Sequence, residues 1–172
     1  TPIEVKPSEK DNKYTAADGV AYLYDGTVLP EMHIDISESE WNRLLKAFDR
    51  DSNTKEQVVC KVTYDKAGEI SVIDSATVRL KGNTSRRRPE GGNGQMHQSG
   101  NTDWHHCHFQ VNFRKLIKDD AHELHGARKV ILKWFKDDPS YVREPYCFDL
   151  FRRAGVWTGV HSAYCKLYIH VG

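Results

Sequence analysis

The chain has 172 residues, with 25 lysines and arginines against 24 aspartates and glutamates. That length fits one domain, which can bury enough surface to fold without the help of disulfides. The near-neutral charge balance argues against a dedicated nucleic-acid binder, which would carry a basic excess on one face. Because the sequence contains no run of about twenty apolar residues, we expect no membrane span.

The N-terminal segment, residues 1–20, is polar and contains no hydrophobic signal-peptide core. It is interpreted as a linker, or as a mature N-terminus left after processing. The domain is expected to occupy residues 21–172. At its start, Tyr22-Leu23-Tyr24 followed by Asp25-Gly26 predicts a short strand and a turn.

A strand and a helix are predicted next. Apolar and polar residues alternate from Met32 to Ile36, which indicates a half-buried strand. Ser37 and Glu40 have the spacing of a capping box, in which each side chain satisfies an amide at the start of a helix. Four apolar residues then share one helical face: Trp41, Leu44, Leu45 and Phe48.

Alternating strands and one long loop fill the middle of the chain. Residues 57–64 alternate, turn at Lys66-Ala67-Gly68 and resume as far as Leu80, which predicts a hairpin or a three-stranded meander. Glycine, asparagine, arginine and histidine dominate residues 82–108, which predicts a long and mobile loop. Alternation at residues 109–113 then predicts another strand.

The stretch Gly126–Gly155 combines a strand with a helix. Val130-Ile131-Leu132 shows no polar alternation, which predicts a short buried strand. Asp138 directly before Pro139 predicts a helix start, because aspartate caps free amides and proline at the first position loses no hydrogen bond. Pro145 lies inside this helix, so we expect either a kink or a start later than Asp138.

Two further segments complete the prediction. Residues 115–124 could contain a helical turn, and residues 163–169 alternate as a last strand. Together the elements predict an α+β fold, in which an antiparallel sheet of about five to seven strands carries two principal helices.

The cysteines could form disulfides, and the histidines together with Cys107 could bind a metal ion. The sequence favours neither. The four cysteines lack C-x-x-C spacing and could form two disulfides or none. Cys60, Cys147 and Cys165 lie in apolar periodic segments, so we expect them to be small core hydrophobes. His97 and His105-His106-Cys107-His108 offer Zn²⁺ ligands, but neighbours on a strand point to opposite faces, so ordinary loop histidines are the preferred interpretation.

Several motifs resemble those of one family. The successive segments G-A-R-K-V-I-L-K, D-P-S-Y-V-R-E and F-D-L-F-R-R-A-G-V resemble the CotH family, secreted bacterial kinase-like proteins named after a spore-coat protein. Residues 78–85 are similar to the R-x-R-G-N-S-S segment of that family, residues 163–169 to its next strand, and residues 32–45 to its opening strand and helix. The resemblance covers residues 30–170 and implies a kinase-like N-terminal lobe.

A kinase resemblance implies ATP and Mg²⁺ as cofactors. A kinase holds nucleotide phosphates with a strand lysine, which a glutamate on the following helix orients. Lys133 ends a segment that looks like the V-A-I-K strand, and Glu144 lies on the next helix. The alternative interpretation is a weak surface ion pair. Arg143 stands where the family has an arginine, and could contact phosphate or tie the helix to the loop that carries Asn83.

The glycine turn at residues 82–85 is a second candidate phosphate contact. Backbone amides in such a turn, next to arginines, can hold an anion. The resemblance implies a cofactor-binding role for Arg79, Asn83, Ser85 and Arg86. The alternative is an ordinary turn beside solvated charges. Relatives usually continue into a lysine-bearing K-K-x-Y segment, whose place is taken here by residues 106–109 behind an enlarged loop.

The function that the resemblance implies is that of a partial enzyme. In the family, the catalytic base and the Mg²⁺ ligands lie beyond the strand that ends at Ile169. The chain would thus be the N-terminal half of a secreted atypical protein kinase, which binds nucleotide phosphates and acts with an exported protein substrate. The alternative is a non-catalytic binding or structural module at the bacterial cell surface. A face meant for the missing half would be apolar and favour self-association.

Overall fold

The computed structural model describes residues 16–119, 122–156 and 158–172. Helices and strands follow one another in the order α1 (Ala16–Tyr24), β1 (Glu31–Ile36), α2 (Glu38–Arg50), β2 (Val58–Lys66), β3 (Glu69–Lys81), β4 (His108–Asn112), β5 (Lys129–Leu132), α3 (Arg143–Arg153) and β6 (Lys166–Val171). The predicted α+β class is confirmed.

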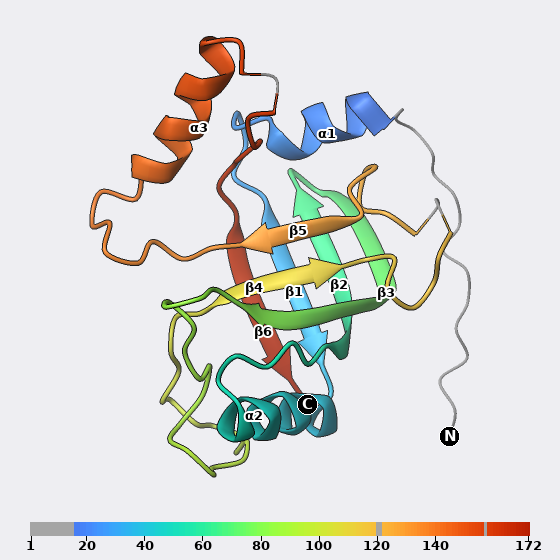
Figure 1. Ribbon diagram of the computed structural model, residues 1–172. Helices are drawn as coiled ribbons and strands as arrows, with labels where there is room; N and C mark the ends of the chain where they lie inside the picture. Colours follow the sequence, from blue (N-terminus) through green and yellow to red (C-terminus); the bar gives the residue numbers. More distant parts are fainter. Residues whose placement is uncertain (1–15, 120–121, 157) are drawn as a thin grey trace.

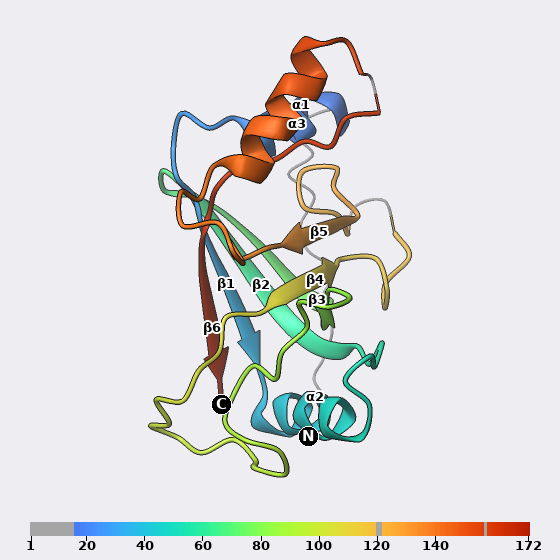
Figure 2. The ribbon, with the colours of Figure 1, turned by 60° about the vertical axis from the view of Figure 1, so that its left-hand side comes forward.

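The strands form one six-stranded sheet in the order β5-β4-β3-β2-β1-β6. All neighbouring pairs are antiparallel except β1 and β6, which are parallel. The prediction of an antiparallel sheet is therefore wrong for β6, which returns beside β1 after the connection through α3. The sheet curls, so that β4 and β5 pass across β1 and β6, with α2 at one end and α1 and α3 at the other (Figures 1 and 2).

The hydrophobic core lies inside this curl, as predicted from the strand alternation. Its residues are inward-facing side chains of β1 to β5 and one face of α2, joined by Leu23 of α1 and by Cys107, Phe113 and Leu124 from the connections. β6 packs partly buried side chains against it. The largest fully buried residues include Trp41, Ile34, Leu44, Leu45, Leu80 and Phe113. The hairpin of β2 and β3 is also confirmed, and a register shift between Cys60 and Val62 bends it.

Helix α2 begins where its capping residues predict. The Ser37 hydroxyl accepts a hydrogen bond from the amide of Glu40 over 3.3 Å. The Glu40 carboxylate does not close the box, because it accepts from the amide of Val59 on β2 at 2.7 Å and from Arg43. This glutamate thus ties the helix to the sheet instead of to its own first turn.

Two short segments differ from the sequence prediction. Tyr22–Tyr24 is the last turn of α1 and not a strand, because a three-residue apolar run has no period of its own and here Leu23 packs into the core. Helix α1 begins at Ala16, inside the segment interpreted as a linker; residues 1–15 lie outside the described residues. Residues 113–119 form turns and bends, with no helical turn in the part of 115–124 that the structure describes.

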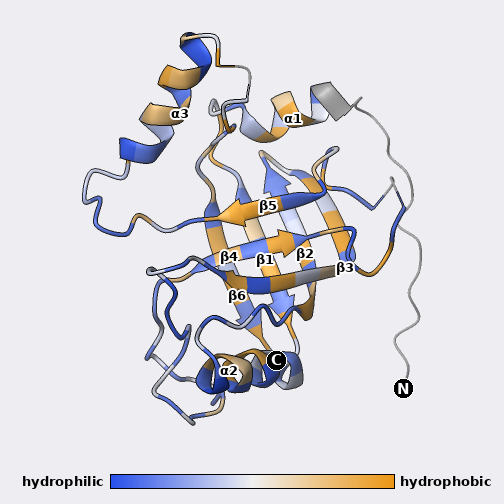
Figure 3. Ribbon diagram, in the orientation of Figure 1, coloured by the Kyte–Doolittle hydropathy of each residue, from blue (hydrophilic) through white to orange (hydrophobic). Residues whose placement is uncertain are grey.

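The unit formed by β5 and α3 departs most from prediction. β5 is an edge strand, where Lys129 and Ile131 are exposed and only Leu132 is buried. α3 has no buried residue, and Figure 3 shows hydrophobic residues among hydrophilic ones along it. The prediction of two helices packed on the sheet therefore holds only for α2. Periodicity reveals an apolar face, but it does not say which surface that face meets.

The start of α3 explains how Pro145 is accommodated. The helix begins at Arg143 and Pro145 is its third residue. Of the two predicted outcomes, a kink or a start later than Asp138, the structure shows the later start. At this position the missing amide would have no partner within the helix, so the proline costs no hydrogen bond. Asp138 instead caps the preceding turn, accepting from the amides of Ser140 at 3.1 Å and Arg143 at 2.9 Å.

Candidate functional site

Lys133 and Glu144 come together at one end of the sheet. Lys133 directly follows β5, and Glu144 lies in the first turn of α3. The segment between them folds back, so that the Lys133 ammonium donates to Glu144 Oε1. Both side chains are almost half exposed, so the ion pair by itself contributes about 1 kcal/mol or less to stability. The ion pair is a candidate site because it borders a cleft.

A cleft of about 850 Å³ opens beside this ion pair. One wall is β5 with the segment that follows it, and the other is formed by residues 160–169, which lead into β6. Glu144, Pro145 and Phe148 line it from α3. The lining is mainly apolar, with Lys133 and Glu144 among its few charged groups. Clefts of about 300–1,000 Å³ with such a lining are typical small-molecule sites.

Trp134 forms an ordered aromatic surface in the cleft. Its ring stacks on that of His106 at a centroid distance of 5.4 Å and on that of His108 at 6.1 Å. His108 Nδ1 accepts a hydrogen bond from the Trp134 amide over 3.3 Å. Burial, and then the nearby Lys133 ammonium, lower the pKa of His108, so this ring is neutral at neutral pH and keeps its acceptor.

The glycine turn at residues 82–85 lies next to His108. A Cβ at Gly82 would lie 3.5 Å from the His108 ring and 2.7 Å from Ser85 Oγ, and the φ of +115° is itself a glycine conformation. The turn is therefore built for glycine. His108 contacts both this turn and Trp134, and Trp134 directly follows Lys133 in the chain.

The arginines around this turn are largely used in holding the backbone. Arg86 donates to the carbonyl oxygens of Gly82 at 3.1 Å and Thr54 at 2.7 Å. Arg79 donates to the Gln110 side chain at 2.9 Å, and burial together with the charge of Arg86 lowers its pKa. Two cations lie close together here, which favours an anion, but several of their donors already bond carbonyl oxygens and the Gln110 side chain.

The sequence of this region matches a known protein family. The family model described as CotH kinase protein matches residues 78–171, which include the glycine turn, the Lys133–Glu144 pair and both walls of the cleft. This chain belongs to the CotH family. No curated protein and no solved structure matches it.

Three other predicted contacts of the CotH chain lie at the surface or away from the cleft. Asn83 is exposed and Ser85 half-buried. Arg143 is 70% exposed, and its guanidinium donates to the Asp137 carbonyl at 3.1 Å and lies 3.6 Å from the Asp138 carboxylate. It therefore ties the helix to the segment before it, and the predicted tie to the loop carrying Asn83 is not found among the described contacts.

The enlarged loop of this CotH chain, residues 82–107, is packed against α2. Arg88 is buried and bonds the Asp49 carboxylate through two nitrogens, at 2.7 and 3.0 Å. Arg88 also donates to the carbonyl oxygens of Glu90 and Gln95. Figure 2 shows the loop beside α2. Its polar composition hid these anchors, because a buried charge pair carries no hydrophobic signal.

Glu90 is the centre of a second buried network in the loop. Its side chain is 1% exposed and accepts hydrogen bonds from Trp41 Nε1 at 2.7 Å, Asn101 Nδ2 at 2.7 Å and His97 Nδ1 at 3.0 Å. Burial opposes the ionisation of this carboxyl, but the three donors outweigh it and hold its pKa below the usual value. Trp104 Nε1 donates to the Asn101 carbonyl at 2.7 Å, and the Trp104 ring, tilted by 48° to that of Trp41, lines the cleft.

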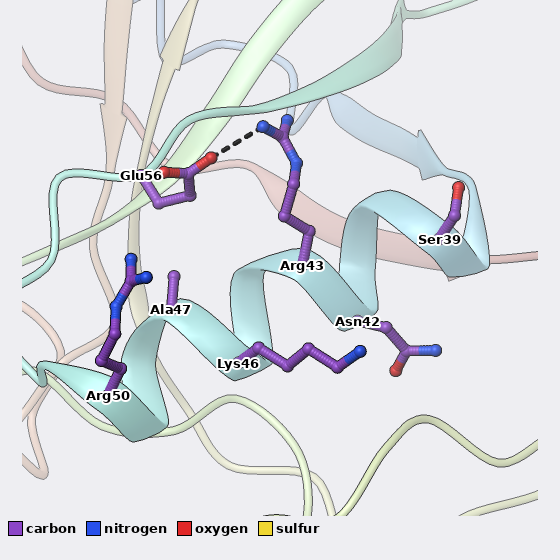
Figure 4. A pocket seen from close by; sticks show the side chains of 7 residues that line it. All are labelled: Ser39, Asn42, Arg43, Lys46, Ala47, Arg50 and Glu56. Carbon is purple, nitrogen blue, oxygen red and sulfur yellow. Dashed lines mark hydrogen bonds and ion pairs between the residues drawn. The ribbon is translucent and has the colours of Figure 1, made fainter.

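A smaller hollow of about 530 Å³ follows α2 on the other side of this loop (Figure 4). Arg43, Lys46 and Arg50 extend into it. Arg43 donates to Glu56 at 2.7 Å, which offsets part of the positive charge. This hollow is polar and shallow compared with the cleft, and it offers an exposed basic surface without apolar walls.

The cysteines and loop histidines have separate roles. All four cysteines are free; Cys60 is buried as predicted, whereas Cys147 is exposed on α3, so its assignment to the core is wrong. Cys107 is also buried, and its thiol donates to a backbone carbonyl. Residues 16–119, 122–156 and 158–172 contain no group of three or more histidine, cysteine or acidic side chains that could hold a metal.

The described residues also include no helix long and apolar enough to cross a membrane.

Proposed function

We propose that this chain is the nucleotide-binding, N-terminal half of a CotH-like protein kinase. The observation that carries the proposal is the Lys133–Glu144 ion pair at the border of a mainly apolar cleft of about 850 Å³. Strand lysine and helix glutamate in this relation are the pair with which protein kinases position nucleotide phosphates. Membership of the CotH family supports the same function.

The cleft divides naturally into two parts for a nucleotide. In the proposal, the Lys133 ammonium binds phosphate oxygens while Glu144 keeps it oriented. The apolar walls of β5 and of residues 160–169 receive the base, with the Trp134 surface beside them. His108 supports this arrangement because it is neutral and fixes the backbone of Trp134 next to the lysine.

The proposal concerns binding and not complete phosphoryl transfer. Mg²⁺ would enter with ATP, where it neutralises phosphate charge. The family resemblance implies that the catalytic base and the Mg²⁺ ligands lie beyond the strand that ends at Ile169, so the proposal assigns neither role to the residues that the structure describes. An exported protein as phosphate acceptor, and a secreted or cell-surface location in a bacterium, follow from the family resemblance alone.

A second function, a non-catalytic binding module at the cell surface, is favoured by the outer face of α3. Tyr146 is 65% exposed, and Leu150 and Phe151 are each 49% exposed. Contiguous apolar side chains of this kind mark surfaces that bind another protein or a second copy. Sedimentation at increasing concentration tests this: association supports the module, whereas a strict monomer at high concentration counts against it.

Calorimetric titration tests the proposed nucleotide site. ATP with Mg²⁺ is titrated into the wild-type chain and into the Lys133→Ala and Arg143→Ala variants. Lys46→Ala, which removes an exposed cation from the hollow along α2, is the matched control. We expect saturable binding that Lys133→Ala weakens at least about tenfold, because a charge-assisted phosphate contact is lost, and that Lys46→Ala leaves unchanged.

The remaining outcomes separate the two functions. Equal weakening by the Lys133 and Lys46 substitutions would mean general attraction of a polyanion and would refute the site. Absence of detectable binding by the wild-type chain would favour the binding module.

A further inference from the structure

Two histidines meet on the outer face of the sheet, on the strands β1 and β6. Parallel pairing sets His33 opposite Tyr168, and Asp35 opposite His170. His33 Nδ1 lies 3.0 Å from His170 Nε2, and the two rings are almost parallel, at 4°. The ring centroids are 5.3 Å apart, so the two nitrogens point at each other and share one proton.

Two neighbouring side chains contact the His33 ring. The Tyr168 ring stacks on it at a centroid distance of 4.7 Å and an angle of 13°. On its other nitrogen, His33 Nε2 lies 3.5 Å from Glu31 Oε2. The hydrogen on His33 therefore belongs on Nε2, and Nδ1 carries a lone pair.

We propose that His33 and His170 form a binding site for a divalent transition-metal ion of the Zn²⁺ or Cu²⁺ class. The metal takes the place of the shared proton. His33 Nδ1 already presents its lone pair, and neutral His170 moves its hydrogen from Nε2 to Nδ1, so that no proton need be released. Two imidazole nitrogens then bind the ion, and water completes the coordination.

The observed spacing suits this chemistry. Metal–nitrogen bonds of about 2.0–2.1 Å span an N···N distance of 3.0 Å when they meet at an angle of about 90–95°. The rings must tilt from their present in-line arrangement, which is feasible because His170 is exposed and the His33 side chain is 31% exposed. A carboxylate on the far nitrogen of a ligating histidine, as Glu31 is here, is the usual support for such a ligand.

This site is separate from the cleft. Side chains alternate between the faces of a strand, so His170 and Tyr168 point away from Leu167 and Ile169, which line the cleft. Metal binding at the histidines is therefore independent of nucleotide binding, and the failure of one proposal leaves the other intact.

Protons compete with the metal at the two imidazoles. The charged or titratable groups of β1, β6 and β2 that share this face are Glu31 and Asp35 on β1, Lys166 and Tyr168 on β6, and Lys61 and Asp65 on β2. Acidic and basic side chains are thus mixed around the pair. Because only a neutral imidazole binds a metal ion, we expect affinity for the metal to fall in acid.

Titration of the tag-free 172-residue chain with ZnCl₂ and CuSO₄ tests the site. The variants are His33→Ala and His170→Ala, with His161→Ala as the control for loss of a single exposed histidine. We expect one metal ion per chain, affinity at least about tenfold lower in either site variant and unchanged affinity in the control. The electron paramagnetic resonance spectrum of bound Cu²⁺ should show two nitrogen ligands in the wild type and one in each site variant.

Folding of each variant is checked by circular dichroism, and His170→Gln replaces any alanine variant that does not fold. Absence of metal binding at neutral pH would overturn the proposal. So would binding that His33→Ala and His170→Ala leave unchanged, or binding that His161→Ala weakens equally.

Discussion

Replacing Glu90 by glutamine tests the buried network that holds the enlarged loop on α2. The substitution keeps the size of the side chain but removes its charge, and it turns one accepting oxygen into a donor. Three donors converge on the wild-type carboxylate, from Trp41, His97 and Asn101, at 2.7–3.1 Å. At least one of them loses its partner in the variant.

The expected cost follows from these contacts. A hydrogen bond to a charged group contributes about 1.5–3 kcal/mol, and an unsatisfied buried donor costs about 1–3 kcal/mol. Because the side chain is 1% exposed, water cannot replace the lost acceptor. We therefore expect Glu90→Gln to lower the free energy of unfolding by about 2–4 kcal/mol, which for a chain of this size lowers Tm by about 5–15 °C.

Urea unfolding at pH 7, followed by tryptophan fluorescence and circular dichroism, measures this free energy. Glu56→Gln is the matched control, because Glu56 is a partly exposed carboxylate whose ion pair with Arg43 contributes about 1 kcal/mol or less. A loss below about 1 kcal/mol for Glu90→Gln, or an equal loss for the control, would refute the assignment of Glu90 as an anchor.

The pH dependence of the same difference gives an independent check. The pKa of Glu90 in the folded chain is below its ordinary value, so its contribution is fully present above the unfolded-state pKa of about 4.3. That contribution is lost as the pH falls through the lower folded-state pKa. The stabilities of the wild type and of Glu90→Gln should therefore converge in acid; a constant difference down to pH 2 would contradict this.

Two further predictions concern the turn beside the cleft and the free thiols. Gly82→Ala should destabilise the fold by about 1–3 kcal/mol, because φ is +115° and the new Cβ would meet a serine hydroxyl. The control Gly26→Ala, with open space around the new Cβ, should cost less than about 1 kcal/mol. Equal losses of unfolding free energy in urea would contradict this reasoning. Cys147 should react rapidly with a disulfide reagent at pH 8, because it is exposed, whereas burial raises the pKa of Cys60 and Cys107 to about 12 and protects them. Mass spectrometry of the labelled peptides would identify the thiol, and early labelling of Cys60 would show that the core opens.

Local patterns predicted those elements whose packing is decided by their own sequence. The strand at Met32–Ile36 and the helix after Ser37 each carry a clear period and a cap, and both form as expected. From the sequence, a Lys133–Glu144 pair required that the end of the strand and the first turn of the helix approach each other, and the structure brings them together. Their role in binding nucleotide stays a prediction.

Other features depend on contacts between distant residues and left no local signal. The parallel pairing of β6 with β1 is decided by a crossover, which alternation in either strand cannot reveal. The anchoring of the loop by Arg88 and Glu90 was missed because polar residues in a glycine-rich segment usually indicate solvent exposure. The exposure of α3 was missed for the opposite reason, since an apolar stripe usually indicates burial.

The most direct test of the nucleotide-binding account is to map where MgATP binds, by following backbone amide chemical shifts of the ¹⁵N-labelled chain. The account predicts that saturating shifts concentrate at Lys133, Trp134 and Glu144, around the cleft. Shifts confined to the hollow along α2, at Lys46 and Arg50, would contradict it, as would the absence of shifts at millimolar MgATP.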